Sequence, residues 1–136
     1  MKRIFKTRFG DRSGYVMPGD TKSGEYRGLT ITARVESDPE SSPHDLDAKG
    51  CCYDTNDPKY GTANKRILDA WDNDEWSYVG VVIDLERNGW SKQHAASLWG
   101  IDANFPRKRK VKWPNRYLDQ VAEELAREAL DTLARS

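Results

Sequence analysis

The sequence predicts an α+β domain, in which a three- to four-stranded antiparallel sheet, built in the order ββαββα, has the C-terminal helix packed on one face. Two observations carry this prediction. The first is a β-hairpin over residues 76–101, whose Asn88-Gly89 pair fits a two-residue type I′ turn because both positions need positive φ. The second is the stretch 114–134, where apolar residues recur at helical spacing. A chain of 136 residues suits a single domain, residues 1–136.

Counting outward from the turn sets Arg87 opposite Trp90 and gives the hairpin two faces. One face carries Val79, Val81, Ile83 and Leu85 against Leu98, Ala96, His94 and Lys92. The other carries Trp76, Tyr78, Gly80 and Val82 against Ile101, Trp99, Ser97 and Ala95. Both faces are largely apolar near the open end, so we expect both to be covered there. In this register His94 opposes Ile83, which favours a packed histidine over a catalytic base.

The remaining elements follow from shorter patterns. Residues 2–9 alternate loosely and are expected to form a strand, whereas 18–24 are turn-like. A more regular alternation predicts a second strand over Tyr26–Glu36. Thr62 can cap a short helix over 63–73, and Pro114 can open the final helix without needing a donor. Between the second strand and the short helix lies an irregular loop, 37–61, of a length that is usually functional or disordered.

Charge is segregated along the chain, although the formal net charge is zero. Residues 1–34 hold eight basic and three acidic side chains, whereas residues 35–80 hold four and eleven. Residues 102–116 hold six and one. Such blocks form surface patches that steer partners. We therefore expect a long acidic loop at 37–61 and a basic loop at 102–113.

The acidic block and the aromatic residues beside it form the leading candidate for partner binding: Asp69, Asp72, Asp74, Glu75, Trp76, Tyr78 and Trp99. The carboxylates could mimic nucleic-acid phosphates or contact a basic groove, or they could only solubilise the loop and a helix edge. The aromatic residues share one predicted sheet face. If the final helix covers that face, they are core; if it packs on the Val79–Leu85 face, they are the expected docking site.

The basic run is the alternative candidate, for nucleic acid: Arg107, Lys108, Arg109, Lys110, Lys112 and Trp113. Clustered cations bind phosphates by counterion release, and aromatic side chains can stack on bases. The run could also be a solvated loop paired in part with the acidic helix that follows, or a contact for an acidic protein. The zero net charge argues against a dedicated nucleic-acid domain.

Catalytic and metal-binding patterns have little support. Cys51 and Cys52 are adjacent, so a disulfide between them is awkward and reduced thiols are expected. A small metal-dependent enzyme would have to use them with His44 and nearby aspartates, at a spacing that matches no zinc pattern. Residues 72–75 resemble part of a calcium loop but lack its glycine and spaced glutamate. We expect a non-catalytic protein without a cofactor.

The sequence shows neither the features of a signal peptide nor those of a membrane span. No apolar run approaches the roughly 20 residues of a membrane span. The basic N-terminus has no apolar stretch behind it, as a signal peptide would. We therefore expect a cytoplasmic protein with no membrane contact.

Three separated motifs resemble small uncharacterised proteins of bacteriophages and prophages. These are AWDNDEWSYVGV from residue 70, ASLWGI from residue 96 and YLDQVAEELA from residue 117. Together they follow the layout AWxNDEWxYVGV … ASLWGI … YLxxVAEELA, within residues 67–126. The resemblance implies a phage-encoded protein in the cytoplasm of an infected or lysogenic bacterium, and it transfers no catalytic or binding residues. Small phage proteins of this kind often bind a host or defence protein, so the resemblance suggests an anti-defence role of the anti-CRISPR type.

Overall fold

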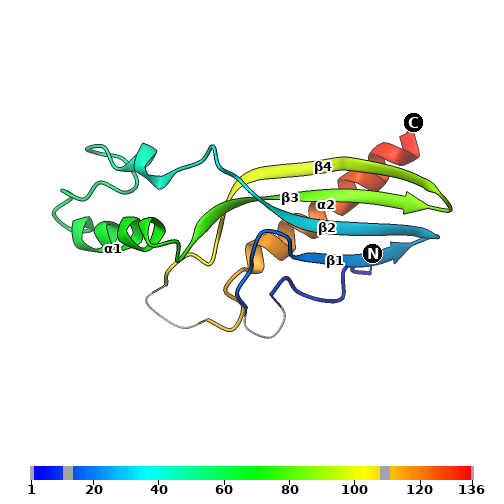
Figure 1. The fold of residues 1–136 in the computed structure, drawn as a ribbon, viewed down its shortest axis with the longest axis horizontal. Coiled ribbons are helices and arrows are strands. Elements are labelled where there is room, and N and C mark those ends of the chain that lie inside the picture. Colours follow the sequence, from blue (N-terminus) through cyan, green and yellow to red (C-terminus); the bar gives the residue numbers. More distant parts are fainter. Residues whose placement is uncertain (1, 11–13, 108–110, 136) are drawn as a thin grey trace.

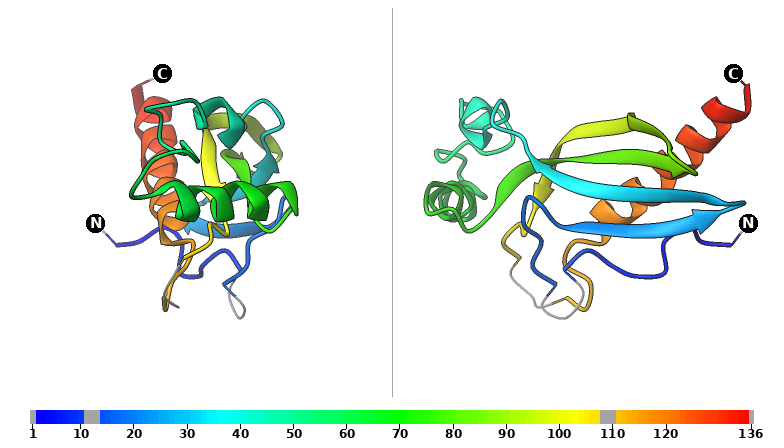
Figure 2. Two further views of the ribbon diagram at one scale, coloured as in Figure 1. Left: turned by 90° about the vertical axis from the view of Figure 1, so that its left-hand side faces the viewer. Right: turned by 45° about the vertical axis from the view of Figure 1, so that its right-hand side comes forward.

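The fold is a four-stranded antiparallel sheet with one long helix on its face. The computed structural model describes residues 2–10, 14–107 and 111–135. The elements are β1 (Thr21–Tyr26), β2 (Leu29–Ser37), a 3-10 helix η1 (Pro43–Leu46), α1 (Gly61–Asp72), β3 (Ser77–Arg87), β4 (Trp90–Ala103) and α2 (Arg116–Arg135). The strands lie side by side in the order β1-β2-β3-β4. The α+β class, the element order and the packed C-terminal helix are therefore confirmed, with α2 crossing one face diagonally (Figure 1) and α1 lying across one end (Figure 2).

The core fills the space between α2 and the sheet. Alternate residues of β2 and β3 point into it, and those on β3 are Val79, Val81, Ile83 and Leu85. From α2, Leu118, Val121, Ala122, Leu125, Ala126 and Ala129 meet them. The alanines on this stripe allow a close approach between the helix and the sheet. The final helix thus packs on the Val79–Leu85 face of the hairpin.

The hairpin turn is as predicted, but its register holds only near the turn. Asn88 and Gly89 have φ of 43° and 84°, and Leu85 pairs with Lys92. Farther out, β4 carries two β-bulges, each with a residue of positive φ: His94 at 54° and Gly100 at 74°. Extra residues in one strand break the two-residue alternation, so side chains beyond a bulge change partners.

Two predictions from the uniform register are therefore wrong. Ile83 pairs with Ala96 instead of His94, and His94 is exposed instead of packed in the core. Ile101 pairs with Val79 and is buried beneath α2, although counting put it on the other face. Carboxylates fix both bulges: Asp84 accepts the His94 N–H at 3.0 Å, and Asp38 accepts the Gly100 N–H at 2.9 Å.

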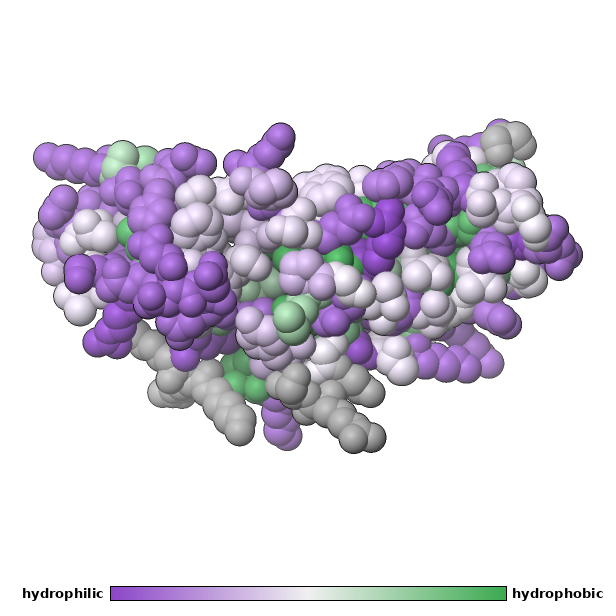
Figure 3. Space-filling view, viewed as in Figure 1, coloured by the Kyte–Doolittle hydropathy of each residue, from purple (hydrophilic) through white to green (hydrophobic). Residues whose placement is uncertain are grey.

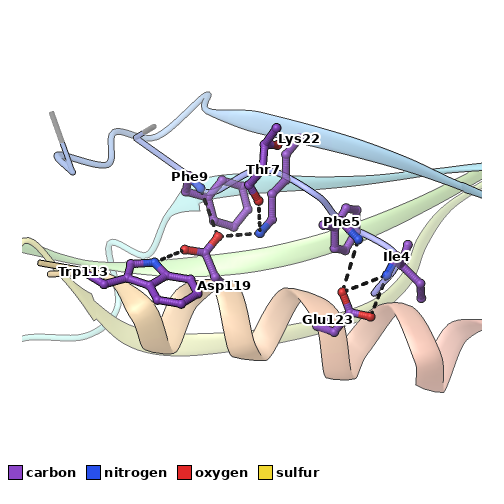
Figure 4. A network of polar contacts seen from close by, with 8 residues as sticks. All are labelled: Ile4, Phe5, Thr7, Phe9, Lys22, Trp113, Asp119 and Glu123. Carbon is purple, nitrogen blue, oxygen red and sulfur yellow. Dashed lines mark hydrogen bonds and ion pairs between the residues drawn. The ribbon is translucent and has the colours of Figure 1, made fainter. Parts of the chain in front are cut away.

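The first predicted strand is also wrong. Residues 2–10 form no strand; they run as an irregular N-terminal segment alongside α2 (Figure 4). The first strand is β1, which overlaps the region 18–24 that the sequence pattern assigned to a turn. The N-terminal segment crosses β1 at Gly24, where an added Cβ would collide with the carbonyl of Ile4. The predicted order ββαββα therefore holds with a different first strand.

Carboxylates of α2 hold the N-terminal segment in place of sheet hydrogen bonds (Figure 4). Glu123 accepts the N–H groups of Ile4 and Phe5, with N–O distances of 3.0 and 3.2 Å. Asp119, which is buried, accepts the Phe9 N–H at 3.0 Å and the Trp113 indole N–H at 2.7 Å. It also forms an ion pair with the buried Lys22 of β1.

We predict that Asp119→Ala destabilises the fold by about 3–5 kcal/mol, because it removes the negative partner of the buried Lys22 ammonium and the acceptor of two N–H groups. Urea unfolding followed by circular dichroism measures this change. The matched control is Asp131→Ala on the same helix, whose pair with Arg135 is largely exposed and should be worth about 0.5 kcal/mol or less. Equal losses of stability in the two variants would contradict the prediction.

Candidate functional site

The face of the sheet opposite α2 is the candidate docking surface. Because α2 packs on the Val79–Leu85 side, this second face carries Tyr78 and Gly80 of β3 and the ring of Trp99 from β4. Figure 3 views the molecule from this side. Hydrophilic residues gather over the α1 end, and paler residues cover the middle of the sheet.

Trp99 is exposed, but its indole packs in one position on this face. Its side chain is 43% exposed. The indole lies directly over Gly80, so closely that a Cβ at that position would collide with the ring. The absence of a side chain at Gly80 is thus what allows the indole to lie flat against the strand. Trp90, at the other end of β4, is equally exposed at 43% but sits beside the hairpin turn.

Residues 37–41 cross this end of the sheet and separate two hollows. Asp38 fixes the crossing, because its carboxylate accepts from the Gly100 N–H and the Ser41 hydroxyl, while its N–H donates to the Tyr78 carbonyl. A hollow of about 610 Å³ lies on the Trp99 side, and Glu40 also lines it. A hollow of about 310 Å³ lies on the α1 side and is lined in part by Trp71, Asp72, Asp74, Trp76 and Tyr78.

Five of the seven residues proposed for partner binding therefore line these adjoining hollows: Asp72, Asp74, Trp76, Tyr78 and Trp99. The other two lie outside them. Asp69 pairs with Lys65 at 3.7 Å on the exposed side of α1, and Glu75 is exposed beyond its end. The acidic and aromatic residues thus meet at one end of the sheet.

Trp76 has a different role from that of an exposed anchor. It is 1% exposed, and its indole N–H donates to the Ile67 carbonyl at 2.8 Å. Edge-to-face contacts with Tyr78 and Phe105 complete a small aromatic cluster under α1. Trp76 therefore fixes α1 to the sheet. Burial raises the pKa of the neighbouring Tyr78 hydroxyl to about 12, so this group stays protonated on the hollow's wall.

His44 links the long loop to α1. Its Nε2 lies 2.8 Å from Asp72, its Nδ1 lies 3.2 Å from Asp47, and its ring meets Trp71 edge-on. The hydrogen bond to Asp72, followed by the one to Asp47, raises the pKa of the imidazole. The sequence pattern suggested His44 only as a metal ligand, because its contact with Asp72 joins residues 28 positions apart in the chain.

His94 belongs to a charged cluster on the open sheet face. Its Nε2 lies 3.0 Å from the Arg34 guanidinium, which also pairs with Asp84 at 2.8 Å and with Glu36. The bulge turns the imidazole out to this cluster. The cluster therefore fastens the bulge to its neighbouring strands.

The basic run is only partly within the described residues. Lys108, Arg109 and Lys110 lie outside them, and Arg107 and Lys112 are exposed. Trp113 is half-buried, with the Arg8 guanidinium 3.9 Å from its ring centroid and those of Arg116 and Arg3 at 5.4 and 5.8 Å. The sequence pattern did not connect the N-terminal arginines with Trp113. The excess positive charge of residues 1–34 was the one feature of the sequence that could have suggested this contact.

The described part of the chain holds neither a metal-binding cluster nor a membrane-spanning helix. Residues 2–10, 14–107 and 111–135 bring together no group of three or more His, Cys, Asp or Glu side chains suited to a metal ion. Within the same ranges, no helix has the length and apolar character needed to span a membrane. Both cysteines are free and exposed.

Comparison of the chain with protein-family models, with curated proteins and with solved structures found no significant match.

We predict that His44 titrates above its ordinary pKa of 6.5 and that Asp72→Asn lowers its pKa, since the largest cause of the shift is removed. NMR titration of the imidazole measures both values. A raised pKa in the folded state means that the stabilising contribution is complete below about pH 6.5 and is lost as the pH rises through the folded value. The Tm difference between wild type and His44→Gln should therefore be larger at about pH 5.5 than at about pH 8. A pKa of 6.5 or lower in the wild type would contradict this assignment.

Proposed function

We propose that this protein is non-catalytic and acts by binding another protein through the two hollows and Trp99. The observation that carries the proposal is the exposed indole of Trp99, held over Gly80 at the rim of a hollow. Large aromatic side chains dominate the energetics of many protein interfaces. A ring that is already held in position loses little conformational entropy on binding, which favours affinity.

The charge of the hollows favours a basic partner. Glu40 borders the Trp99 hollow, and Asp72 and Asp74 border the other one. Residues 35–80 together hold eleven acidic and four basic side chains. A partner with a basic contact surface and an apolar pocket for the indole fits this arrangement, and association with it would be accelerated by electrostatic steering.

A basic surface is what enzymes that handle nucleic acid present to their substrate. Together with the resemblance to phage and prophage proteins, this supports an anti-defence role in an infected or lysogenic bacterium, of the anti-CRISPR type. The partner would then be a host or defence protein whose nucleic-acid groove is blocked. Function at such a site needs contact alone, with no bond made or broken.

Nucleic-acid binding through residues 105–116 is the second candidate function. The observation that favours it is the position of Trp113 among three arginine side chains, next to the exposed Lys112. This site is separate from the acidic hollows.

We predict that Trp99→Ala weakens partner binding by about 2 kcal/mol, or roughly 30-fold in Kd, because it removes the central aromatic anchor. The partner is isolated by pull-down from lysates of defence-positive host strains, and the Kd is then measured by calorimetry with the purified partner. Trp90→Ala is the matched control, since it removes an indole of equal exposure from the same strand. It should leave the Kd unchanged.

A second pair of variants tests the charge argument. Glu40→Gln/Asp74→Asn should weaken binding and reduce its salt dependence, whereas Glu25→Gln/Glu86→Gln at the other end of the sheet should do neither. Failure to recover any stoichiometric partner from defence-positive strains would count against the proposal. Equal reductions in affinity from Trp99→Ala and Trp90→Ala would exclude this surface.

A further inference from the structure

A third hollow lies on the α2 side of the sheet, between the N-terminal segment and the beginning of α2. It is a hollow of about 560 Å³, within the size range of ligand pockets. Three separate stretches of the chain form its walls: residues 3–8, Lys22 of β1, and residues 113–127. Residues 1–34 and 102–116, the two positive blocks of the sequence, therefore meet here.

The hollow has an excess of uncompensated positive charge. Six basic side chains line it: Arg3, Lys6, Arg8, Lys22, Arg116 and Arg127. Two of them are already engaged, since Lys22 pairs with Asp119 and Arg127 pairs with Glu123. The other four form no ion pair with the residues that the structure describes. Three carboxylates also line the hollow. Asp119 and Glu123 each accept several hydrogen bonds, and only Glu124 is exposed.

Trp113 lies among these basic side chains. Its indole N–H is bound by Asp119 at 2.7 Å, which fixes the ring plane. Three guanidinium groups surround the ring, the nearest being that of Arg8. Guanidinium planes donate to phosphate oxygens in a fork and also offer flat surfaces on which unpaired bases stack. The combination therefore suits a ligand that has both phosphates and exposed bases.

Neighbouring cations extend the site beyond a single phosphate. Lys112 is exposed next to Trp113, and the Arg107 guanidinium donates to the Pro114 carbonyl at 3.4 Å, so both lie beside the hollow. This continuation fits a polyanion whose successive phosphates follow the protein surface. A duplex carries its phosphates on the outside of a rigid rod with its bases stacked inside, whereas a single strand can enter a hollow of this size.

We propose that the hollow around Trp113 binds single-stranded nucleic acid, with Arg3, Lys6 and Arg8 of the N-terminal segment supplying most of the phosphate contacts. This inference rests on the second candidate function, nucleic-acid binding, and moves its centre from the basic loop to a composite site. The N-terminal segment is then a binding element, and the carboxylates of α2 that hold it position its arginines.

Fluorescence anisotropy with labelled oligothymidylate and oligouridylate, over a range of salt concentrations, tests the site. Arg3→Gln/Arg8→Gln should weaken binding and reduce the slope of log K against log salt by about 1.4, or about 0.7 for each phosphate that is no longer neutralised. Lys49→Gln/Lys59→Gln removes the same charge from exposed residues near α1 and should leave the slope unchanged. Glu124→Gln should tighten binding, a gain that unfolding cannot produce.

The remaining outcomes show whether the composite site alone is wrong or whether nucleic-acid binding itself is wrong. If Arg107→Gln/Lys112→Gln weakens binding while Arg3→Gln/Arg8→Gln does not, the protein binds nucleic acid through the loop and the composite site is wrong. If neither single-stranded probe binds at low salt, both the function and the site are wrong. Equal affinity for a duplex or for polyglutamate would exclude the single-stranded ligand class.

Discussion

The buried carboxylate of Asp119 is the interaction on which the arrangement of this protein depends. It accepts donors from three other parts of the chain: the Phe9 backbone, the Lys22 ammonium and the Trp113 indole. The three donors belong to the N-terminal segment, to β1 and to the residues just before α2. A buried carboxylate is stable only when donors surround it. The hydrogen bonds and the ion pair of Asp119 therefore hold the N-terminal segment, β1 and the residues before α2 together.

The elements that pack around α2 determine what each side of the molecule presents. With the N-terminal segment held against α2, Arg3 and Arg8 are brought to Trp113, and cations distant in sequence share one hollow. With α2 packed on the Val79–Leu85 side, the other sheet face is left to Tyr78 and Trp99. The zero net charge of the chain is therefore the sum of a positive hollow around Trp113 and an acidic end that carries Tyr78 and Trp99.

How much of this could be predicted depends on the range of the interactions involved. The Asn88-Gly89 turn and the α2 stripe were predictable, since a turn pair and a helical repeat act over a few residues. The irregular path of residues 2–9 was not predictable. Ile4 and Phe5 are adjacent yet both buried, and their N–H groups bond to Glu123, over a hundred residues away. β1 was missed because Gly24, read as a turn residue, is the crossing point of that segment.

The candidate sites also divide into features set by nearby residues, which could be predicted, and features set by distant ones, which could not. Composition and spacing gathered Asp72, Asp74, Tyr78 and Trp99 into one surface, since acidic and aromatic residues are dense near the hairpin's open end. Counting could not foresee the bulges, because it assumes that residues alternate without interruption along both strands. Yet the bulge at Gly100 is what carries Ile101 into the core and gives Asp38 an N–H to bind. The bulge thus supplies one of the hydrogen bonds through which Asp38 fixes the crossing of residues 37–41 between the two hollows.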